Sequence, residues 1–120
     1  MLFELRRYRC KEGKRDEWVA LMESRIIPLQ IAKGMTVVGS FVDEGDPDRY
    51  VWIRRFASEA ERERLYAEVY QSDEWTNDLS PIIDGLLYRD QIEVTRLNPT
   101  TASPPSTTAD IDTPAGASAW

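Results

Sequence analysis

Residues 35–56 read MTVVGSFVDEGDPDRYVWIRRF, and this stretch decides the fold. Its first part, from Met35 to Asp43, is rich in β-branched and aromatic residues, which is typical of a strand. Unbroken alternation would place Met35, Val37 and Phe41 on one face and Val38 and Val42 on the other. Its last part, from Arg49 to Phe56, places Tyr50, Trp52, Arg54 and Phe56 on one face. The acidic segment 44–48 between them contains Gly and Pro, so we predict an antiparallel hairpin.

The segment before the hairpin predicts one strand and one helix. Leu2–Arg9 alternates as a strand, and a helix is expected from about Lys14. One stripe of this helix recurs every three or four residues: Trp18, Leu21, Met22, Arg25 and Leu29. Pro28 is expected to break or kink the helix, and Ile27 before it to be extended.

The segment after the hairpin predicts a second helical region and a last strand. Ser58 and Glu61 form a capping box, a further short helix opens at Ser72, and Tyr88–Leu97 is the last strand. The order β-α-β-β-α-β predicts an α+β, ferredoxin-like domain with an antiparallel sheet and helices on one face. The other sheet face keeps apolar side chains, so we expect part of it to pack on a second subunit.

Composition divides the chain into two parts. Residues 1–97 have the pattern of a folded domain, and residues 98–120 are rich in Pro, Ser, Thr and Ala with no Lys or Arg. Such a segment has little to bury, so we predict a flexible tail. Trp120 at its end is either incidental or an anchor that docks on the same or a neighbouring subunit.

The charge and the counts of His and Cys exclude several classes of protein. The formal net charge is −6, which disfavours nucleic acid and anionic membranes as partners. No apolar run is long enough to span a bilayer, and charges by position four argue against a signal peptide. The chain has no histidine and a single cysteine, Cys10, so we expect no metal, no haem and no Ser-His-Asp arrangement. One cysteine forms no internal disulfide, and this fits a cytoplasmic protein.

Three segments resemble the NIPSNAP family. FELRRYRCKEGKRDEW, from Phe3, resembles the family's opening strand, turn and helix. VVGSFVDEGDPDRYVWIRRFASEAERERLY, from Val37, resembles its hairpin, and YQSDEW, from Tyr70, its Tyr/Phe-x-Ser-x-x-Trp segment. Glu12 stands where many members have Pro. The resemblance covers about residues 2–97 and implies the dimeric α+β barrel, in which two ferredoxin-like subunits pack sheet against sheet.

The wider superfamily implies a range of activities for such a barrel. It includes cofactor-independent oxygenases, isomerases, dehydratases and polyketide cyclases, which hold a small aromatic or polyketide-type molecule between helices and sheet. The histidines of haem-binding relatives are absent here, so the resemblance implies no haem chemistry.

Candidate site residues gather on the first and third strands. Glu4, Arg6 and Tyr8 alternate on one strand and Trp52 and Arg54 on the other, and these strands are neighbours in the predicted fold. As residues for chemistry we select Glu4, Tyr8, Arg54 and Asp90, and as substrate-binding residues Arg6, Tyr50, Trp52, Trp75 and Tyr88. Arg54 would bind the anionic end of a ligand and Trp52 would stack on it. The alternative is a salt-bridged, aromatic-rich sheet face at the dimer interface, in which Arg54 pairs with a carboxylate such as Glu4.

The sequence and the family resemblance lead to two hypotheses about function. The first is a homodimeric protein that binds or converts a small aromatic or polyketide-type molecule without cofactor. The second is a non-catalytic dimeric interaction protein. An enclosed cavity with aromatic walls favours the first, and a filled core favours the second. The sequence does not decide whether a reaction is catalysed.

Overall fold

Four strands form one antiparallel sheet in the computed structural model, which describes residues 1–103. The strands are β1 (Leu2–Arg9), β2 (Thr36–Val42), β3 (Arg49–Phe56) and β4 (Glu93–Leu97). Their order in the sheet is β2-β3-β1-β4, and every neighbouring pair is antiparallel. The predicted ferredoxin-like α+β fold is confirmed, with β1 and β3 at the centre.

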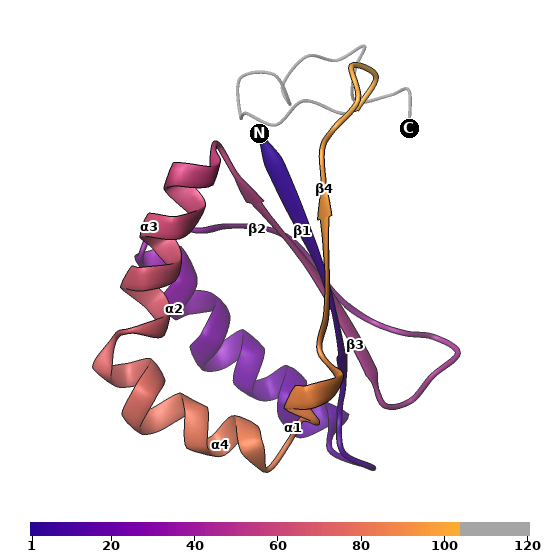
Figure 1. Cartoon of the computed structure of the whole chain (residues 1–120). Helices are drawn as coiled ribbons and strands as arrows, with labels where there is room; N and C mark the ends of the chain where they lie inside the picture. The colour runs from indigo at the N-terminus through magenta and orange to yellow at the C-terminus, as the bar shows by residue number, and fades with distance from the viewer. Residues whose placement is uncertain (104–120) are drawn as a thin grey trace.

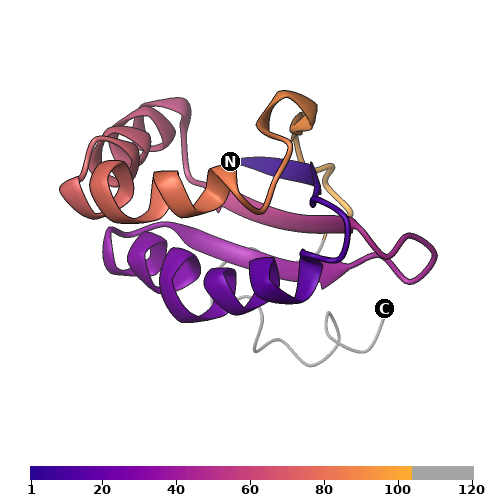
Figure 2. The same cartoon turned by 90° about the horizontal axis from the view of Figure 1, so that it is seen from below.

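The helices form two limbs that both lie on one side of the sheet (Figure 1). The first limb consists of α1 (Arg15–Leu21), a π-helical turn (Met22–Ile26) and α2 (Ile27–Ala32). The second consists of α3 (Glu59–Tyr70), a π-helical turn (Glu74–Leu79) and α4 (Ser80–Asp84). Figure 2 shows the two limbs side by side across the sheet, so the molecule has two layers with the core between them.

Alternation along β1 and β3 sorts their side chains between the helices and the open side. Residues opposite each other in the register share a face, and Glu4 lies opposite Arg54, Arg6 opposite Trp52, and Tyr8 opposite Tyr50. These residues face the helices. The open face carries Phe3, Leu5, Val51 and Ile53, whose sequence neighbours are those buried residues.

The first helical limb continues through Pro28, contrary to the predicted break. Ile27 has helical dihedrals (φ −60°, ψ −47°), and Pro28 lies in the first turn of α2. A proline ring clashes with the carbonyl four residues earlier and lacks the N–H that would bond it. The wider π turn directly before α2 accommodates both effects, so the limb continues as a helix. Ile26, not Arg25, completes the buried stripe.

A bulge in β2 changes which residues face the helices. The register shifts between Val37 and Gly39, so Val37 lies opposite Arg54 on the helix side while Phe41 lies opposite Val51 on the open side. Unbroken alternation would have put Val37 and Phe41 on the same face. The extra residue of a bulge resets the alternation, and a period-2 pattern alone does not reveal it.

The last strand is shorter than predicted. β4 begins at Glu93, and a 3₁₀ turn (Arg89–Gln91) precedes it. Tyr88 and Asp90 therefore lie outside the sheet. After β4, residues 98–103 pass beside the open face. The rest of the predicted tail, with Trp120, lies outside the described residues.

Candidate functional site

A buried ion pair occupies the centre of the helix-facing sheet surface. Glu4 of β1 and Arg54 of β3 lie opposite each other, and Arg54 Nη2 donates to Glu4 Oε1 at 2.7 Å. Both side chains are fully buried. The pairing that the sequence offered as an alternative is therefore present. The face that carries it is covered by the helices and is not the open face.

Two residues of α3 complete the surroundings of the Glu4 carboxylate. Tyr66 donates its hydroxyl hydrogen toward both carboxylate oxygens at 2.7 Å, and Arg62 Nε donates to Oε2 at 2.6 Å. Burial by itself would raise the pKa of Glu4, but the charge of Arg54 and these hydrogen bonds hold that pKa below its ordinary value. Glu4 is thus an ionised anchor with its acceptor positions occupied, which makes it a weak base.

Arg54 is committed to the protein on both terminal nitrogens. Nη1 donates to Gln30 Oε1 at 2.9 Å and to the Tyr70 hydroxyl at 2.7 Å, and Nη2 also donates to the Tyr66 hydroxyl at 2.7 Å. The rings of Trp52, Tyr66, Phe56 and Tyr70 surround the guanidinium at 4.8–5.9 Å from their centroids. In this arrangement Arg54 holds α2, α3 and the sheet together and presents no free terminal N–H to a ligand.

Arg6 occupies a different position, at the edge of the same network. Its Nε donates to the Tyr8 hydroxyl at 2.8 Å and its Nη1 to the Tyr66 hydroxyl at 3.0 Å. The nearest Glu4 oxygen is 3.8 Å away, beyond hydrogen-bond length, and the Arg6 side chain is 15% exposed. Arg6 therefore reaches the edge of the network that solvent touches.

A small, half-open cavity of about 60 Å³ lies beside Arg6, between the sheet and the helices, and we call it the Arg6 cavity. Its lining comprises Arg6, Tyr8, Trp18, Tyr70, Trp75, Ile83, Leu87, Arg89 and Ile92. A cavity of ~150 Å³ is the size that takes up benzene in an engineered protein core. The Arg6 cavity is therefore too small for an aromatic ring as it stands.

A wider and more open groove of about 340 Å³ lies on α3 and shares Tyr70 with the Arg6 cavity. Its other lining residues are Arg62, Glu63, Tyr66, Ala67 and Gln71. This volume is in the range of small-molecule sites. The cavity and the groove share Tyr70, and we take them together as the candidate site, which we call the α3 cleft.

The predicted site residues separate into three groups. Arg6, Tyr8 and Trp75 line the α3 cleft, while Glu4, Arg54, Tyr50 and Trp52 are buried beside or behind it. Asp90 is exposed in the 3₁₀ turn, and the 38% exposed Tyr88 stacks its ring against Lys11. Neither Asp90 nor Tyr88 lines the cleft.

Sequence reasoning missed the contribution of α3. Arg62, Tyr66 and Tyr70 recur every four residues and so share one helix face, which the structure places over Glu4 and Arg54. The four-residue spacing was the feature of the sequence that could have revealed this shared face. Polar residues at helical spacing are normally interpreted as a solvent-exposed helix face. Here they face the sheet, where Arg62 and Tyr66 bond the buried carboxylate of Glu4 and Tyr70 accepts from Arg54.

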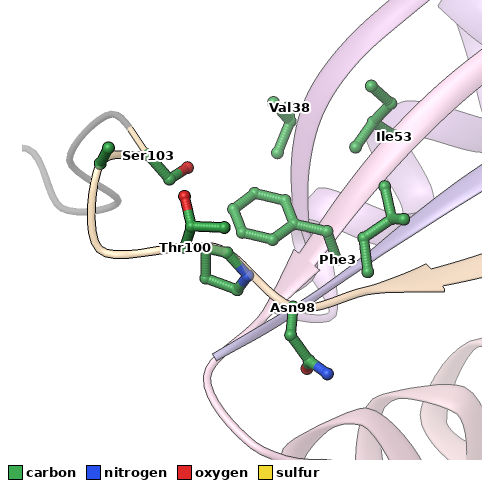
Figure 3. Close-up of a pocket in the computed structure, with 9 residues that line it drawn as sticks. Phe3, Val38, Ile53, Asn98, Thr100 and Ser103 are labelled. Atoms are coloured by element: carbon green, nitrogen blue, oxygen red, sulfur yellow. The ribbon is translucent and has the colours of Figure 1, made fainter.

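The open sheet face carries a second, apolar groove of about 540 Å³. Figure 3 shows the Phe3 ring lying between Val38 and Thr100, with Ile53 close by. Val38, Phe41 and Leu97 on this face are 43–51% exposed. A sheet face with half-exposed large apolar residues is typical of an interface.

Residues 1–103 contain no group of three or more Cys, Asp or Glu side chains placed to hold a metal ion. None of the helices in that part combines the length and apolar character that a bilayer crossing requires.

The sequence model of the NIPSNAP family matches residues 3–104, which is most of the chain. This chain belongs to the NIPSNAP family. The protein Atu4242 from Agrobacterium tumefaciens is a solved relative with 28% identity and a TM-score of 0.77, covering 88% of this chain and 100% of its own.

Two further solved structures place this NIPSNAP protein among its relatives. The NIPSNAP family protein Atu5224 from Agrobacterium tumefaciens is 24% identical with a TM-score of 0.78, over 88% of this chain and 98% of its own. A structure described as an antibiotic biosynthesis monooxygenase is 20% identical with a TM-score of 0.63, over 83% of this chain and 99% of its own. It shares the fold. No curated protein matches the sequence.

Proposed function

We propose that this NIPSNAP protein is a cytoplasmic homodimer that binds or converts a small aromatic or polyketide-type molecule in the α3 cleft, without metal or haem. If it is an enzyme, the reaction is of the cofactor-independent oxygenase, isomerase or cyclase type. The observation that carries the proposal is the half-open Arg6 cavity with aromatic walls, formed by Tyr8, Trp18, Tyr70 and Trp75, next to a groove of ligand size that shares Tyr70 with it. The fold that this chain shares with a structure described as an antibiotic biosynthesis monooxygenase supports the oxygenase type among these reactions.

The lining of the cavity limits the chemistry. Among residues 1–103 the Arg6 cavity is lined by no carboxylate, the Glu4 carboxylate has its acceptor positions occupied, and Asp90 lies outside the cleft. Glu63 lines only the open groove, where its side chain is exposed to solvent. Burial raises the pKa of Tyr66 to about 12, so its phenol is a poor base near neutral pH. We therefore favour binding, or a reaction in which the substrate supplies its own base, over general-base catalysis by Asp or Glu.

Dimerisation would use the open face. Phe3, Val38, Ile53 and Leu97 form a continuous apolar surface there, and a second sheet would remove it from water. Val38→Asp should abolish the dimer while the monomer stays folded, because half of that side chain is already exposed. Ile31→Asp, an equally exposed apolar site on α2, is the matched control. A wild-type monomer in sedimentation at micromolar concentration would remove the barrel proposal.

The ligand part of the proposal needs a separate experiment. We expect aromatic acids and polyketide-type phenols to raise the melting temperature and to change the tryptophan fluorescence, because Trp18 and Trp75 line the cavity. A dimer that responds to none of these ligands would favour the alternative function, a non-catalytic dimeric interaction protein. The apolar groove on the open sheet face is the observation that supports this alternative, because a protein partner could bind there.

A further inference from the structure

The Arg6 cavity offers hydrogen-bond donors without matching acceptors. The Tyr8 hydroxyl accepts a hydrogen bond from Arg6, and the Tyr70 hydroxyl accepts from Arg54 and from Gln30 Nε2. Within residues 1–103 the hydrogens of these two hydroxyl groups have no acceptor. The indole Nε1–H of Trp18, a residue that is only 2% exposed, also has no acceptor there. Buried donors are normally satisfied, so this set indicates a missing acceptor.

The charges around the Arg6 cavity also indicate a missing anionic acceptor. Three guanidinium groups, those of Arg6, Arg54 and Arg62, approach the buried carboxylate of Glu4. Arg54 and Arg62 bond that carboxylate directly, and Arg62 also pairs with Glu59 at 3.3 Å. Among residues 1–103, Arg6 is left with no carboxylate of its own at hydrogen-bond distance. A largely buried cation normally has an anionic partner.

The size and polarity of the cavity decide which ligand group fits. A cavity of about 60 Å³ has room for a few waters, or for one carboxylate or enolate head group. Water would bring hydrogens for which the lining side chains offer few acceptors. An anionic oxygen accepts several hydrogen bonds and donates none, so it complements Arg6, Tyr8 and Tyr70.

We propose that the half-open Arg6 cavity is an oxyanion site, in which Arg6, Tyr8 and Tyr70 bind the carboxylate, phenolate or enolate oxygen of a ligand whose body lies in the groove over α3. This rests on the proposed function and narrows it to anionic ligands. Burial raises the pKa of the Tyr8 phenol, so Tyr8 keeps its hydrogen for donation at neutral pH. Arg54 takes no direct part and serves to position Tyr66 and Tyr70.

The test compares anions with neutral isosteres on the full chain at neutral pH. Benzoate is titrated against benzamide, and formate against formamide, with tryptophan fluorescence as the readout because Trp18 and Trp75 line the cavity. We expect benzoate to bind at least about 10-fold more tightly than benzamide, since hydrogen bonds to charged groups are worth that or more. Equal affinity for the acid and the amide would overturn the oxyanion site.

Three variants assign the effect to the cavity. Arg6→Gln should weaken benzoate binding about 10- to 100-fold and leave benzamide unchanged. Arg64→Gln removes the same charge from a 61% exposed position on α3 and should leave benzoate binding intact. Tyr8→Phe keeps the packing and should give a smaller loss, which tests the site even if Arg6→Gln fails to fold. A loss in Arg64→Gln equal to that in Arg6→Gln would reduce the effect to overall charge and refute the site.

The formate pair separates this inference from the proposed function. Formate fits the Arg6 cavity and needs no contact with the groove. Binding of formate without benzoate would support the oxyanion site and contradict the aromatic ligand. Equal binding of benzoate and benzamide, unaffected by Arg6→Gln, would support the aromatic ligand and refute the oxyanion site. Failure of every probe would overturn both.

Discussion

Replacing Arg54 by Leu removes the cation at the centre of the helix-facing sheet surface. The guanidinium is fully buried and donates to Glu4, Gln30, Tyr66 and Tyr70 at 2.7–2.9 Å. Leucine replaces the stem but none of these donors. The Glu4 carboxylate would keep its bonds to Arg62 and Tyr66 and lose its only fully buried counter-charge.

The expected loss of stability is large. Removing one partner of a buried ion pair costs about 3–5 kcal/mol in the free energy of unfolding, because the other charge stays buried. The stranded Gln30 oxygen and Tyr70 hydroxyl belong to the same network, so their cost is not added separately. A domain of this size has a total stability of about 5–15 kcal/mol. At roughly 4–8 °C per kcal/mol, the melting temperature should fall by at least ~12 °C.

Chemical denaturation and thermal melts of Arg54→Leu measure this loss directly. Arg64→Leu is the control, because Arg64 is 61% exposed and its pair with Glu68 at 3.5 Å should contribute below ~1 kcal/mol. The double variant Glu4→Gln/Arg54→Leu should be less destabilised than the sum of the single variants, since it leaves no stranded charge. A stability loss below ~1 kcal/mol together with abolished ligand binding would refute the structural role. It would indicate instead that Arg54 binds the ligand directly.

Three further predictions follow from individual residues. The pKa of Glu4 is lower in the folded chain than its ordinary value of 4.5, so its stabilising contribution is complete above pH 4.5 and is lost as the pH falls through the folded pKa. Glu4→Gln should therefore flatten the acid limb of the stability profile, and an unchanged limb would contradict the assignment. Burial raises the pKa of Cys10 to about 11, so a thiol reagent at pH 8 should label the native protein slowly and the denatured protein at once, whereas rapid native labelling would contradict the buried site. Ser58→Ala removes the side-chain cap on the Glu61 amide at 3.1 Å and should cost about 1 kcal/mol, measured by urea denaturation; no loss would mean that the cap is redundant.

Local sequence patterns were sufficient for the element order. Strict alternation in 2–9 and 49–56 predicted two strands with the correct faces, because the side-chain period of a strand is independent of its partners. The capping box at Ser58 marked the start of α3, since its hydrogen bonds are made within four residues. The patterns failed where a neighbour altered the local rule, at the β2 bulge and at the π turn before Pro28.

The features of the candidate site also separate into those that local patterns predicted and those that depend on tertiary packing. Alternation placed Glu4, Arg6 and Tyr8 on one face of one strand and Trp52 and Arg54 on one face of its predicted neighbour. Whether those two faces agree depends on the strand register, which the structure supplies. Only the tertiary structure decided that Arg54 is enclosed while Arg6 reaches a cavity. That difference depends on how α3 lies over the sheet, with Tyr66 and Tyr70 closing the space above Arg54 and leaving Arg6 at the edge. Burial of a side chain depends on how the helices pack on the sheet, so the spacing of residues along a single strand does not predict it.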